Sequence, residues 1–218
     1  MEQIRNLIFD LGGVVYDIRY ENLADKLEEY GIQNMEGFYT KDFQTHWMDL
    51  FETGQLSAAE YRDYLRNLAH SDLPDEKVDE VVNAILIDVP KERVALLLAL
   101  RQKYRVFLFS NTNEINYDCF TQRMRDKFGF DMFAACFEHC YYSHHLHLRK
   151  PDVRGFQIIL EEQHLKPEET LFIDDIAKNA AGARKAGIHA HHLATGNILE
   201  LFDEGFNLKI DFTNETNK

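Results

Sequence analysis

The sequence predicts an α/β protein: a Rossmann-like parallel sheet flanked by helices, with a small all-helical cap domain inserted into it. Short apolar runs alternate with longer helical patterns along the chain, as in folds where crossover helices join parallel strands. These runs lack the strict alternation of strands that expose one face, so we expect helices on both faces of the sheet. Roughly ninety residues separate the first two runs, far more than one crossover needs. This interval predicts the inserted domain.

Five apolar segments are the candidate strands of the sheet. Each is only a few residues long and is rich in the branched and aromatic side chains that favour strands. In chain order the segments are residues 7–9, 106–109, 140–142, 171–173 and, with a less regular pattern, 188–193.

The interval after the first strand contains three helical patterns. The first covers residues 21–31 and ends at Gly31, a residue typical of helix ends. The second begins with Ser57 and Glu60, which have the spacing of a capping box. The third covers residues 75–86 and places its valines on one side. Together they indicate that the interval is helical.

These patterns divide the chain into two predicted domains and a tail. Residues 1–17 together with 89–210 are expected to form the α/β core, which includes a helix that begins after Pro90 and leads into the second strand. Residues 18–88 are expected to form the cap domain. Residues 211–218 are polar and are expected to be a frayed tail.

The composition excludes several classes of function. The 218 residues carry a formal net charge of −13, which disfavours non-specific binding to nucleic acid or to anionic lipid. No apolar stretch approaches the ~20 residues that span a bilayer, and the N-terminus lacks the apolar region of a secretory signal. The three cysteines show no zinc-type spacing, so we expect reduced thiols and a cytoplasmic protein.

Polar residues follow four of the predicted strands. In chain order these are Asp10, then Ser110, Asn111 and Thr112, then Lys150 in the loop after the third strand, and finally Asp174 with Asp175. Ligands of open parallel sheets bind beyond the carboxyl ends of the strands. The sequence therefore predicts that these residues converge on one site.

This set of residues suits phosphoryl transfer, in which positioning and charge neutralisation do most of the catalytic work. The Asp10 carboxylate is the candidate nucleophile and would form an aspartyl-phosphate. Mg²⁺ prefers carboxylate and carbonyl oxygens, so Asp10, Asp175 and the carbonyl of Gly12 are its candidate ligands. Asp174 is a further candidate, either as a ligand or as a residue that orients a metal-bound water.

The phosphate itself is expected to meet hydroxyl, amide and ammonium donors. Ser110 and Lys150 are the candidate catalytic residues that hold the transferring oxygens, and they would stabilise charge in the transition state. Asn111 and Thr112, which follow Ser110 directly, are expected to assist in binding the phosphate.

The four motifs resemble those of the haloacid dehalogenase superfamily. The matching segments are "FDLGG" at 9–13, "VFLFSNTN" at 106–113, Lys150-Pro151 and "LFIDDIAKNAAGARKAG" at 171–187. The resemblance covers essentially the whole chain, and the insert is similar to a C1-type cap. Within the family, the motifs most resemble those of the sugar-phosphate phosphatases. This resemblance implies a Mg²⁺-dependent phosphatase that uses Asp10 as nucleophile on a small phosphorylated metabolite.

Gly12 departs from the family pattern, because phosphatases of the family usually carry a general acid/base at this position. Losing such a group typically costs ~10²–10⁴-fold in rate. Asp17 or a water could replace it, although we expect Asp17 to cap the first insert helix. An ester with a good leaving group would not need it. A phospho-ligand-binding protein without turnover and a dehalogenase are the alternative functions.

Two further features leave alternatives open. His144, His145 and His147 could form a transition-metal site, but a solvated loop is expected because no acid or thiol lies nearby in the sequence. Asn179 could position Asp175 or cap its own helix. The sequence predicts neither the identity of the substrate nor the oligomeric state.

Overall fold

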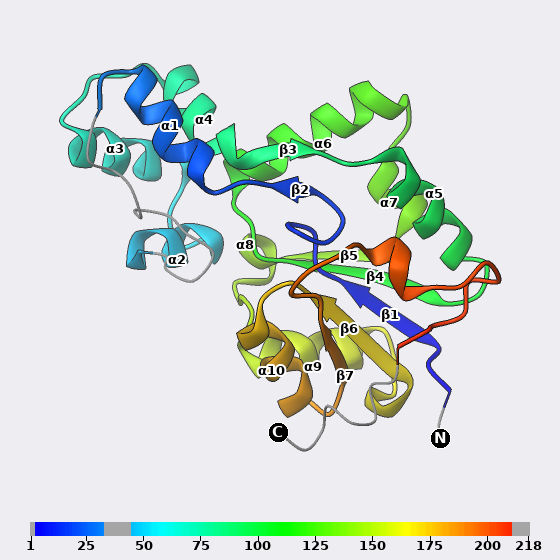
Figure 1. The fold of residues 1–218 in the computed structure, drawn as a ribbon. Coiled ribbons are helices and arrows are strands. Elements are labelled where there is room, and N and C mark those ends of the chain that lie inside the picture. The colour runs from blue at the N-terminus through cyan, green and yellow to red at the C-terminus, as the bar shows by residue number, and fades with distance from the viewer. Residues whose placement is uncertain (1–2, 33–44, 211–218) are drawn as a thin grey trace.

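The computed structural model describes residues 3–32 and 45–210, so the predicted tail at 211–218 lies outside the described residues. Five parallel strands form the central sheet in the order β5-β4-β1-β6-β7 (Figure 1). The strands are β1 (Asn6–Phe9), β4 (Arg105–Ser110), β5 (His139–Tyr142), β6 (Thr170–Asp174) and β7 (His189–His192). All five lie where the apolar segments predict them, and the Rossmann-like α/β fold is confirmed.

Helices cover both faces of this sheet, as the lack of polar alternation predicts (Figure 1). Leu7 and Phe9 of β1 pack into one apolar core, whereas Ile8 between them packs into the other. On the first face lie α5 (Lys91–Leu100), α6 (Glu114–Phe128) and α7 (Met132–Cys136). On the second face lie α9 (Val153–Glu162) and α10 (Ala177–Lys185). Short helices α8 (Ser143–Leu146), η2 (Pro167–Glu169) and η3 (Ile198–Leu201) complete this part of the chain.

The helices of the insert gather at one end of the molecule, beside the carboxyl ends of the strands (Figure 1). They are α1 (Glu21–Glu29), α2 (His46–Glu52), α3 (Ala58–Ala69) and α4 (Asp75–Val82), followed by η1 (Asn83–Ile85). Two apolar clusters hold them together, one centred on Phe51 and Tyr61 and the other on Leu23 and Val81. The capping box predicted at Ser57 is confirmed, because Ser57 and Glu60 bond each other's backbone N–H groups.

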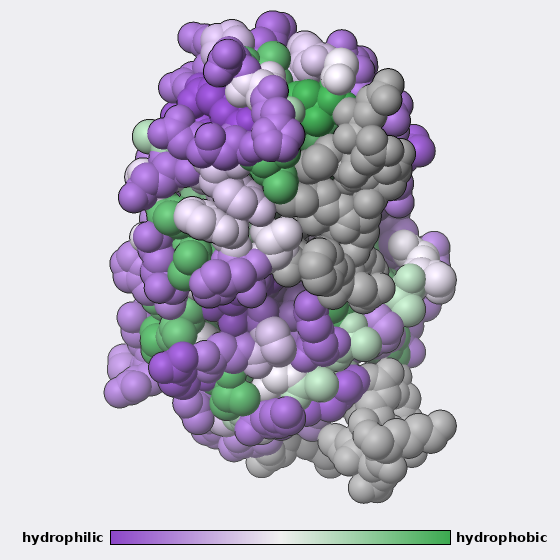
Figure 2. Space-filling view, turned by 90° about the vertical axis from the view of Figure 1, so that its left-hand side faces the viewer, coloured by the Kyte–Doolittle hydropathy of each residue, from purple (hydrophilic) through white to green (hydrophobic). Residues whose placement is uncertain are grey.

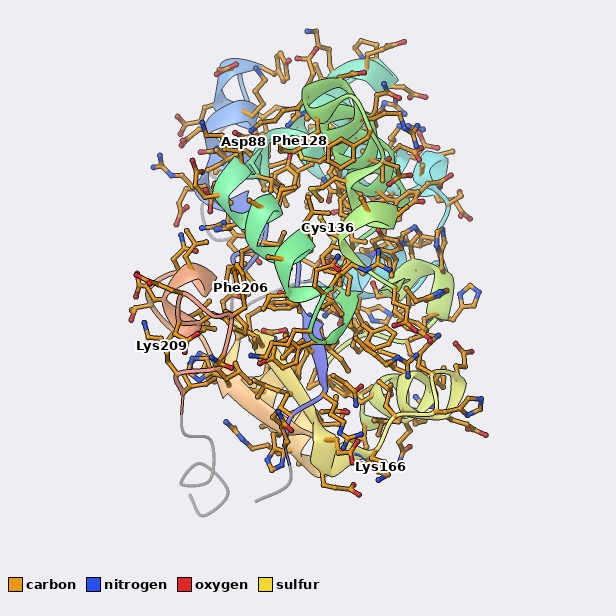
Figure 3. The ribbon with its side chains drawn as sticks, turned by 90° about the vertical axis from the view of Figure 1, so that its right-hand side faces the viewer. Asp88, Phe128, Cys136, Lys166, Phe206 and Lys209 are labelled. Carbon is orange, nitrogen blue, oxygen red and sulfur yellow. The ribbon has the colours of Figure 1, made fainter. Side chains whose placement is uncertain are left out.

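A two-stranded antiparallel ribbon joins the insert to the rest of the chain. It pairs β2 (Asp17–Ile18) with β3 (Leu86–Asp88) and was not predicted, because strands of two or three residues carry no readable pattern. Lys127 near the end of α6 binds Asp88 at 2.6 Å, and Arg123 donates a hydrogen bond to the carbonyl of Leu86. Figure 3 shows Asp88 beside Phe128 at this junction. The ribbon is thus anchored to the core helices.

The expectation that Asp17 caps the first insert helix is wrong. Asp17 lies in β2, and its carboxylate binds the guanidinium of Arg93 at 2.6 Å. The N-cap of α1 is Tyr20, which makes no side-chain capping bond. A buried arginine offers a carboxylate a stronger partner than the end of a helix does, so the ion pair decides where Asp17 lies.

The surface of the protein is mostly hydrophilic on the face shown in Figure 2, where hydrophobic residues are scattered among polar ones. In the described parts of the chain, no helix combines the length and the apolar character needed to cross a membrane. Cys136 is fully buried near α5, as Figure 3 shows, and Cys119, Cys136 and Cys140 are free thiols. The cytoplasmic location stays a prediction.

Candidate active site

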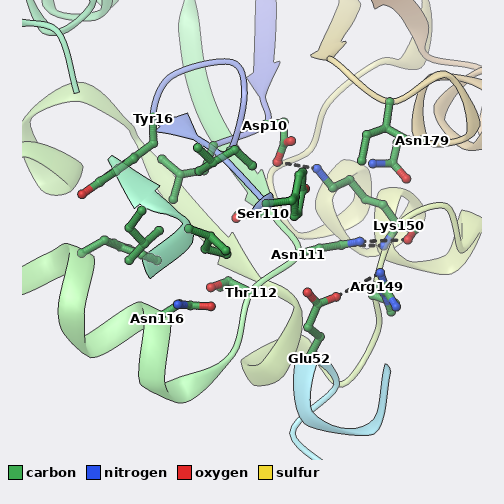
Figure 4. A pocket seen from close by; sticks show the side chains of 18 of the residues that line it. Asp10, Tyr16, Glu52, Ser110, Asn111, Thr112, Asn116, Arg149, Lys150 and Asn179 are labelled. Atoms are coloured by element: carbon green, nitrogen blue, oxygen red, sulfur yellow. Dashed lines mark hydrogen bonds and ion pairs between the residues drawn. The ribbon is translucent and has the colours of Figure 1, made fainter. Parts of the chain in front are cut away.

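Three adjacent strands bring their polar ends together at one edge of the sheet. β1 lies between β4 and β6, so Asp10 after β1, Ser110 at the end of β4 and Asp174 at the end of β6 become neighbours. Lys150 reaches the same place from the loop after α8 (Figure 4). Of the predicted site residues, Asp10, Gly12, Ser110, Asn111, Thr112 and Lys150 line one pocket.

Lys150 ties two of these strand ends together. Its ammonium group lies 2.7 Å from Oδ1 of Asp10 and 2.8 Å from Oδ2 of Asp174. Burial alone would lower the pKa of Lys150, but the two carboxylates outweigh it and raise the pKa above its ordinary value. Lys150 is therefore a fixed positive charge although only 1% of its surface is exposed.

The carboxylates of Asp10, Asp174 and Asp175 form a compact acidic cluster, with ligand atoms within 4.8 Å of one another. All three residues are buried. Burial raises the pKa of Asp10, and the charges of Asp174 and Asp175 raise it further against the opposing effect of Lys150. Three carboxylates around one ammonium group thus carry an excess of negative charge.

This donor set fits a hard divalent cation such as Mg²⁺. It offers oxygen atoms alone, and a cation among them would offset the repulsion between Asp10 and its neighbours. Asp174 is held by the protein itself, since it accepts hydrogen bonds from Lys150, from the backbone of Ile176 and from Asn179. Asn179 thus positions Asp174, whereas the sequence suggested Asp175 or its own helix.

Two glycines shape the backbone beside the acidic cluster. Gly13 has a φ of +77°, and a Cβ there would lie 2.5 Å from Oδ2 of Asp175. Glycine is therefore required at position 13 both by the backbone and by the close approach of the carboxylate. A Cβ at Gly12 would point at Ile18, 3.0 Å from its Cδ1. A side chain at position 12 would therefore crowd Ile18.

The segment after β4 is held rigidly against the lysine loop. The Asn111 side chain donates to the carbonyl of Lys150 at 3.0 Å and accepts from its N–H at 2.8 Å. Ser143, which is fully buried, exchanges hydrogen bonds with the backbone of Thr112. The amide of Asn111 is thus engaged in positioning Lys150, and the hydroxyl of Ser110 is buried at the pocket wall.

The pocket also contains residues that the sequence analysis missed. Glu52, from the end of α2, and Arg149 line the pocket and form an ion pair of 3.0 Å. The signals were present in the sequence. Glu52 follows Met48 by four positions and so shares its buried helix face, and Arg149 directly precedes Lys150.

The histidine loop differs from the expected solvated loop at one position. His145 and His147 are exposed, but His144 is buried, and its ring centre lies 4.0 Å from that of His145 with the rings tilted by 45°. Burial, with the nearby charge of His145, lowers the pKa of His144 to about 4. No histidine belongs to the group of potential metal ligands that the described residues form.

Comparison with known proteins identifies relatives over most of the chain. A family model described as haloacid dehalogenase-like hydrolase matches residues 4–187. The chain is 28% identical over 195 residues to the D-ribitol-5-phosphate phosphatase of Bacteroides thetaiotaomicron. The aligned region covers 88% of this chain and 93% of that protein.

Two solved structures of a HAD family enzyme from the same organism are similar in fold. A single-site variant in complex with magnesium and inorganic phosphate has a TM-score of 0.82 at 28% identity and covers 99% of this chain and 100% of that chain. A second structure has a TM-score of 0.79 at 33% identity, and the match covers 88% of this chain and 94% of that chain.

Proposed function

The chain belongs to the haloacid dehalogenase-like hydrolase family and is a phosphoric monoester hydrolase, and on this premise we propose that it is Mg²⁺-dependent and cleaves a small phosphorylated sugar or polyol. One observation carries the proposal. Asp10, the first residue after the central strand, lies beside Lys150 and within an acidic cluster that suits a divalent cation.

Asp10 is the proposed nucleophile. One of its carboxylate oxygens attacks phosphorus, and the bond from phosphorus to the ester oxygen breaks as the aspartyl-phosphate forms. The leaving alkoxide takes a proton from a water molecule to become the free alcohol. A water molecule then attacks the aspartyl-phosphate, which releases inorganic phosphate and regenerates Asp10.

The proposed Mg²⁺ ligands are Asp10, Asp175 and the carbonyl of Gly12, with Asp174 held in place to orient a metal-bound water. The cation would neutralise phosphate charge that these carboxylates otherwise repel. Asp174 suits the orienting task because its oxygens accept hydrogen bonds from Lys150, Ile176 and Asn179.

Ser110, Thr112 and Lys150 are the proposed phosphate-binding groups, with Ser110 and Lys150 stabilising the transferring oxygens. Their position at the pocket wall beside Asp10 supports this assignment. The two hydrogen bonds between Asn111 and the Lys150 backbone support a positioning role for Asn111. Positioning of this kind keeps the ammonium group aimed at the reacting phosphate.

Residues 18–88 are the proposed cap domain, which covers the pocket and excludes water from it. Two apolar clusters made almost entirely of insert residues support this division, and Ile115 of α6 is the core residue that joins one of them. The presence of Ile18, Tyr20 and Glu52 among the residues that line the pocket supports the proposal as well.

The substrate is proposed by similarity to the D-ribitol-5-phosphate phosphatase. Purified protein supplied with Mg²⁺ and a panel of pentitol, pentose and hexose phosphates should release phosphate, and a chelator should stop the reaction. Asp10→Asn should abolish it, whereas Asp25→Asn, at an exposed position of α1, should not.

A further inference from the structure

We infer that Glu52, held in place by Arg149, is the residue that selects the leaving group of the substrate, and that it selects a neutral group rich in hydroxyls. This inference rests on the proposed phosphatase function and deepens it. It assigns specificity to one carboxylate of the insert and gives the leaving group a chemical class.

Glu52 is a buried carboxylate that faces the pocket. It is the last residue of α2, only 2% of its surface is exposed, and it lines the same pocket as Asp10 and Lys150. Figure 4 shows its carboxylate beside Thr112 and facing Arg149, on the side of the pocket formed by the insert. A charged group is rarely buried at a pocket wall unless it is paired or serves a ligand.

Arg149 fixes the position of this carboxylate relative to the reacting centre. Its guanidinium lies 3.0 Å from Oε2 of Glu52 and also binds Asp49, one turn earlier in α2. Arg149 directly precedes Lys150, whose ammonium group contacts Asp10. Glu52 is therefore linked, through one residue of the backbone, to the lysine that touches the nucleophile.

The chemistry of a carboxylate defines what this wall can recognise. An ionised carboxylate only accepts hydrogen bonds, and each hydroxyl of a sugar or polyol can donate one. Charge-assisted bonds of this kind are stronger than neutral ones, and a site built for them rejects analogues that lack the hydroxyl. A second phosphate or a carboxylate on the leaving group would instead be repelled.

Arg149 does not by itself neutralise the two acids that it binds. Asp49 and Glu52 share the single guanidinium of Arg149, so the three side chains retain a net negative charge. Tyr20 also lines the pocket, and the charges of Asp175, Asp10 and Glu52 add to the burial that raises the pKa of its phenol. Lys178 is the exposed cation among the described pocket residues, and it belongs to α10 in the core.

Asp49 provides a matched control, because it tests whether the Arg149 contacts merely dock the insert onto the core. It binds the same guanidinium from the same helix, but 47% of its side chain is exposed and it does not line the pocket. A docking role predicts similar effects at both acids. A specificity role predicts an effect at Glu52 alone.

The test compares two phosphate esters whose leaving groups are both alkyl alcohols, a pentitol phosphate and pentyl phosphate. The measured quantity is the ratio of their kcat/KM values. Glu52→Gln should lower this ratio by ~10–100-fold, as expected for a lost charge-assisted contact. Asp49→Asn should keep the ratio of the unsubstituted protein. Arg149→Met should lower the ratio like Glu52→Gln, and Arg149→Lys should restore part of it.

Equal losses on both esters with Glu52→Gln would overturn the inference, because they would indicate proton transfer or folding instead of recognition. An equal fall of the ratio in Asp49→Asn would overturn it as well. Calorimetric affinities of both esters for Asp10→Asn protein, with and without Glu52→Gln, provide a readout that does not need turnover. If neither ester is hydrolysed by the unsubstituted protein, the proposed function fails, and these affinities still decide the role of Glu52.

Discussion

The ammonium group of Lys150 lies 2.7 Å from Oδ1 of Asp10, although 140 positions separate the two residues in the sequence. The contact exists because β1 is the central strand and the loop after α8 returns to its carboxyl end. The same ammonium group binds Asp174, so one cation connects the end of β1 with the end of β6.

Replacing Lys150 by methionine should destabilise the fold as well as stop turnover. Methionine has a similar length but no charge, so buried carboxylates would lose their counter-charge, a change that typically costs ~3–5 kcal/mol. The free energy of unfolding should be measured in urea with a chelator present. Lys178→Met, at an exposed position of the same pocket, is the control, and an equal loss there would contradict the account.

Restoring an acid at position 12 should require that Ile18 be made smaller. Two double variants are compared, Gly12→Asp with Ile18→Ala and Gly12→Asn with Ile18→Ala. The first should hydrolyse alkyl phosphates ~10²-fold faster than the second, because only aspartate supplies a general acid. Rates for p-nitrophenyl phosphate should differ much less, since its leaving group needs no proton. Similar gains on both esters would show that the role given to this position is wrong.

Gly13→Ala should specifically weaken the binding of magnesium. The new methyl group would collide with Asp175, so the Mg²⁺ concentration at half-maximal rate should rise ~10-fold. Separately, the left-handed backbone at this position should cost the fold ~1–2 kcal/mol of strain. Gly31→Ala is the matched control, because Gly31 has a φ of +79° with nothing within 4 Å of its Cβ. Both variants should lose stability, and only Gly13→Ala should change the metal requirement.

His144 should make the fold less stable in mild acid. Its pKa is lowered to about 4 in the folded protein and is ~6.5 when unfolded, so the unfolded chain binds the proton more readily. Stability should therefore be complete above pH ~6.5 and fall as the pH drops toward 4, by ~2 kcal/mol at pH 5. His144→Phe should remove this part of the pH dependence in urea unfolding. The same change at exposed His139, whose charge does not contribute to the shift, should not. An unaltered profile in His144→Phe would refute the explanation.

The parts of the fold that the sequence predicted are those with strong local signals. Each core strand is a continuous apolar run, and the capping box at Ser57 needs only Glu60 three positions later. The strand-end rule also brought Asp10 and Ser110 to one pocket, because parallel neighbours share an edge.

The parts that the sequence did not predict depend on partners far along the chain. The local sequence around Asp17 suggests a helix cap, but its partner is Arg93, which lies 76 positions further along the chain. Glu52 and Arg149 are 97 positions apart in the sequence, and no local pattern around either residue indicates that the two form an ion pair. Asn179 likewise binds Asp174, which only the packing of α10 against β6 determines.

The site of covalent attachment of the phosphoryl group tests the central claim most directly. A labelled pentitol phosphate should be mixed with the protein and Mg²⁺, quenched in acid within one turnover, and the peptides analysed by mass spectrometry. We expect a phosphoryl group that survives the brief quench and is released by hydroxylamine on the peptide that contains Asp10, and its absence in Asp10→Asn. Label on another residue, or turnover that persists in Asp10→Asn, would contradict it.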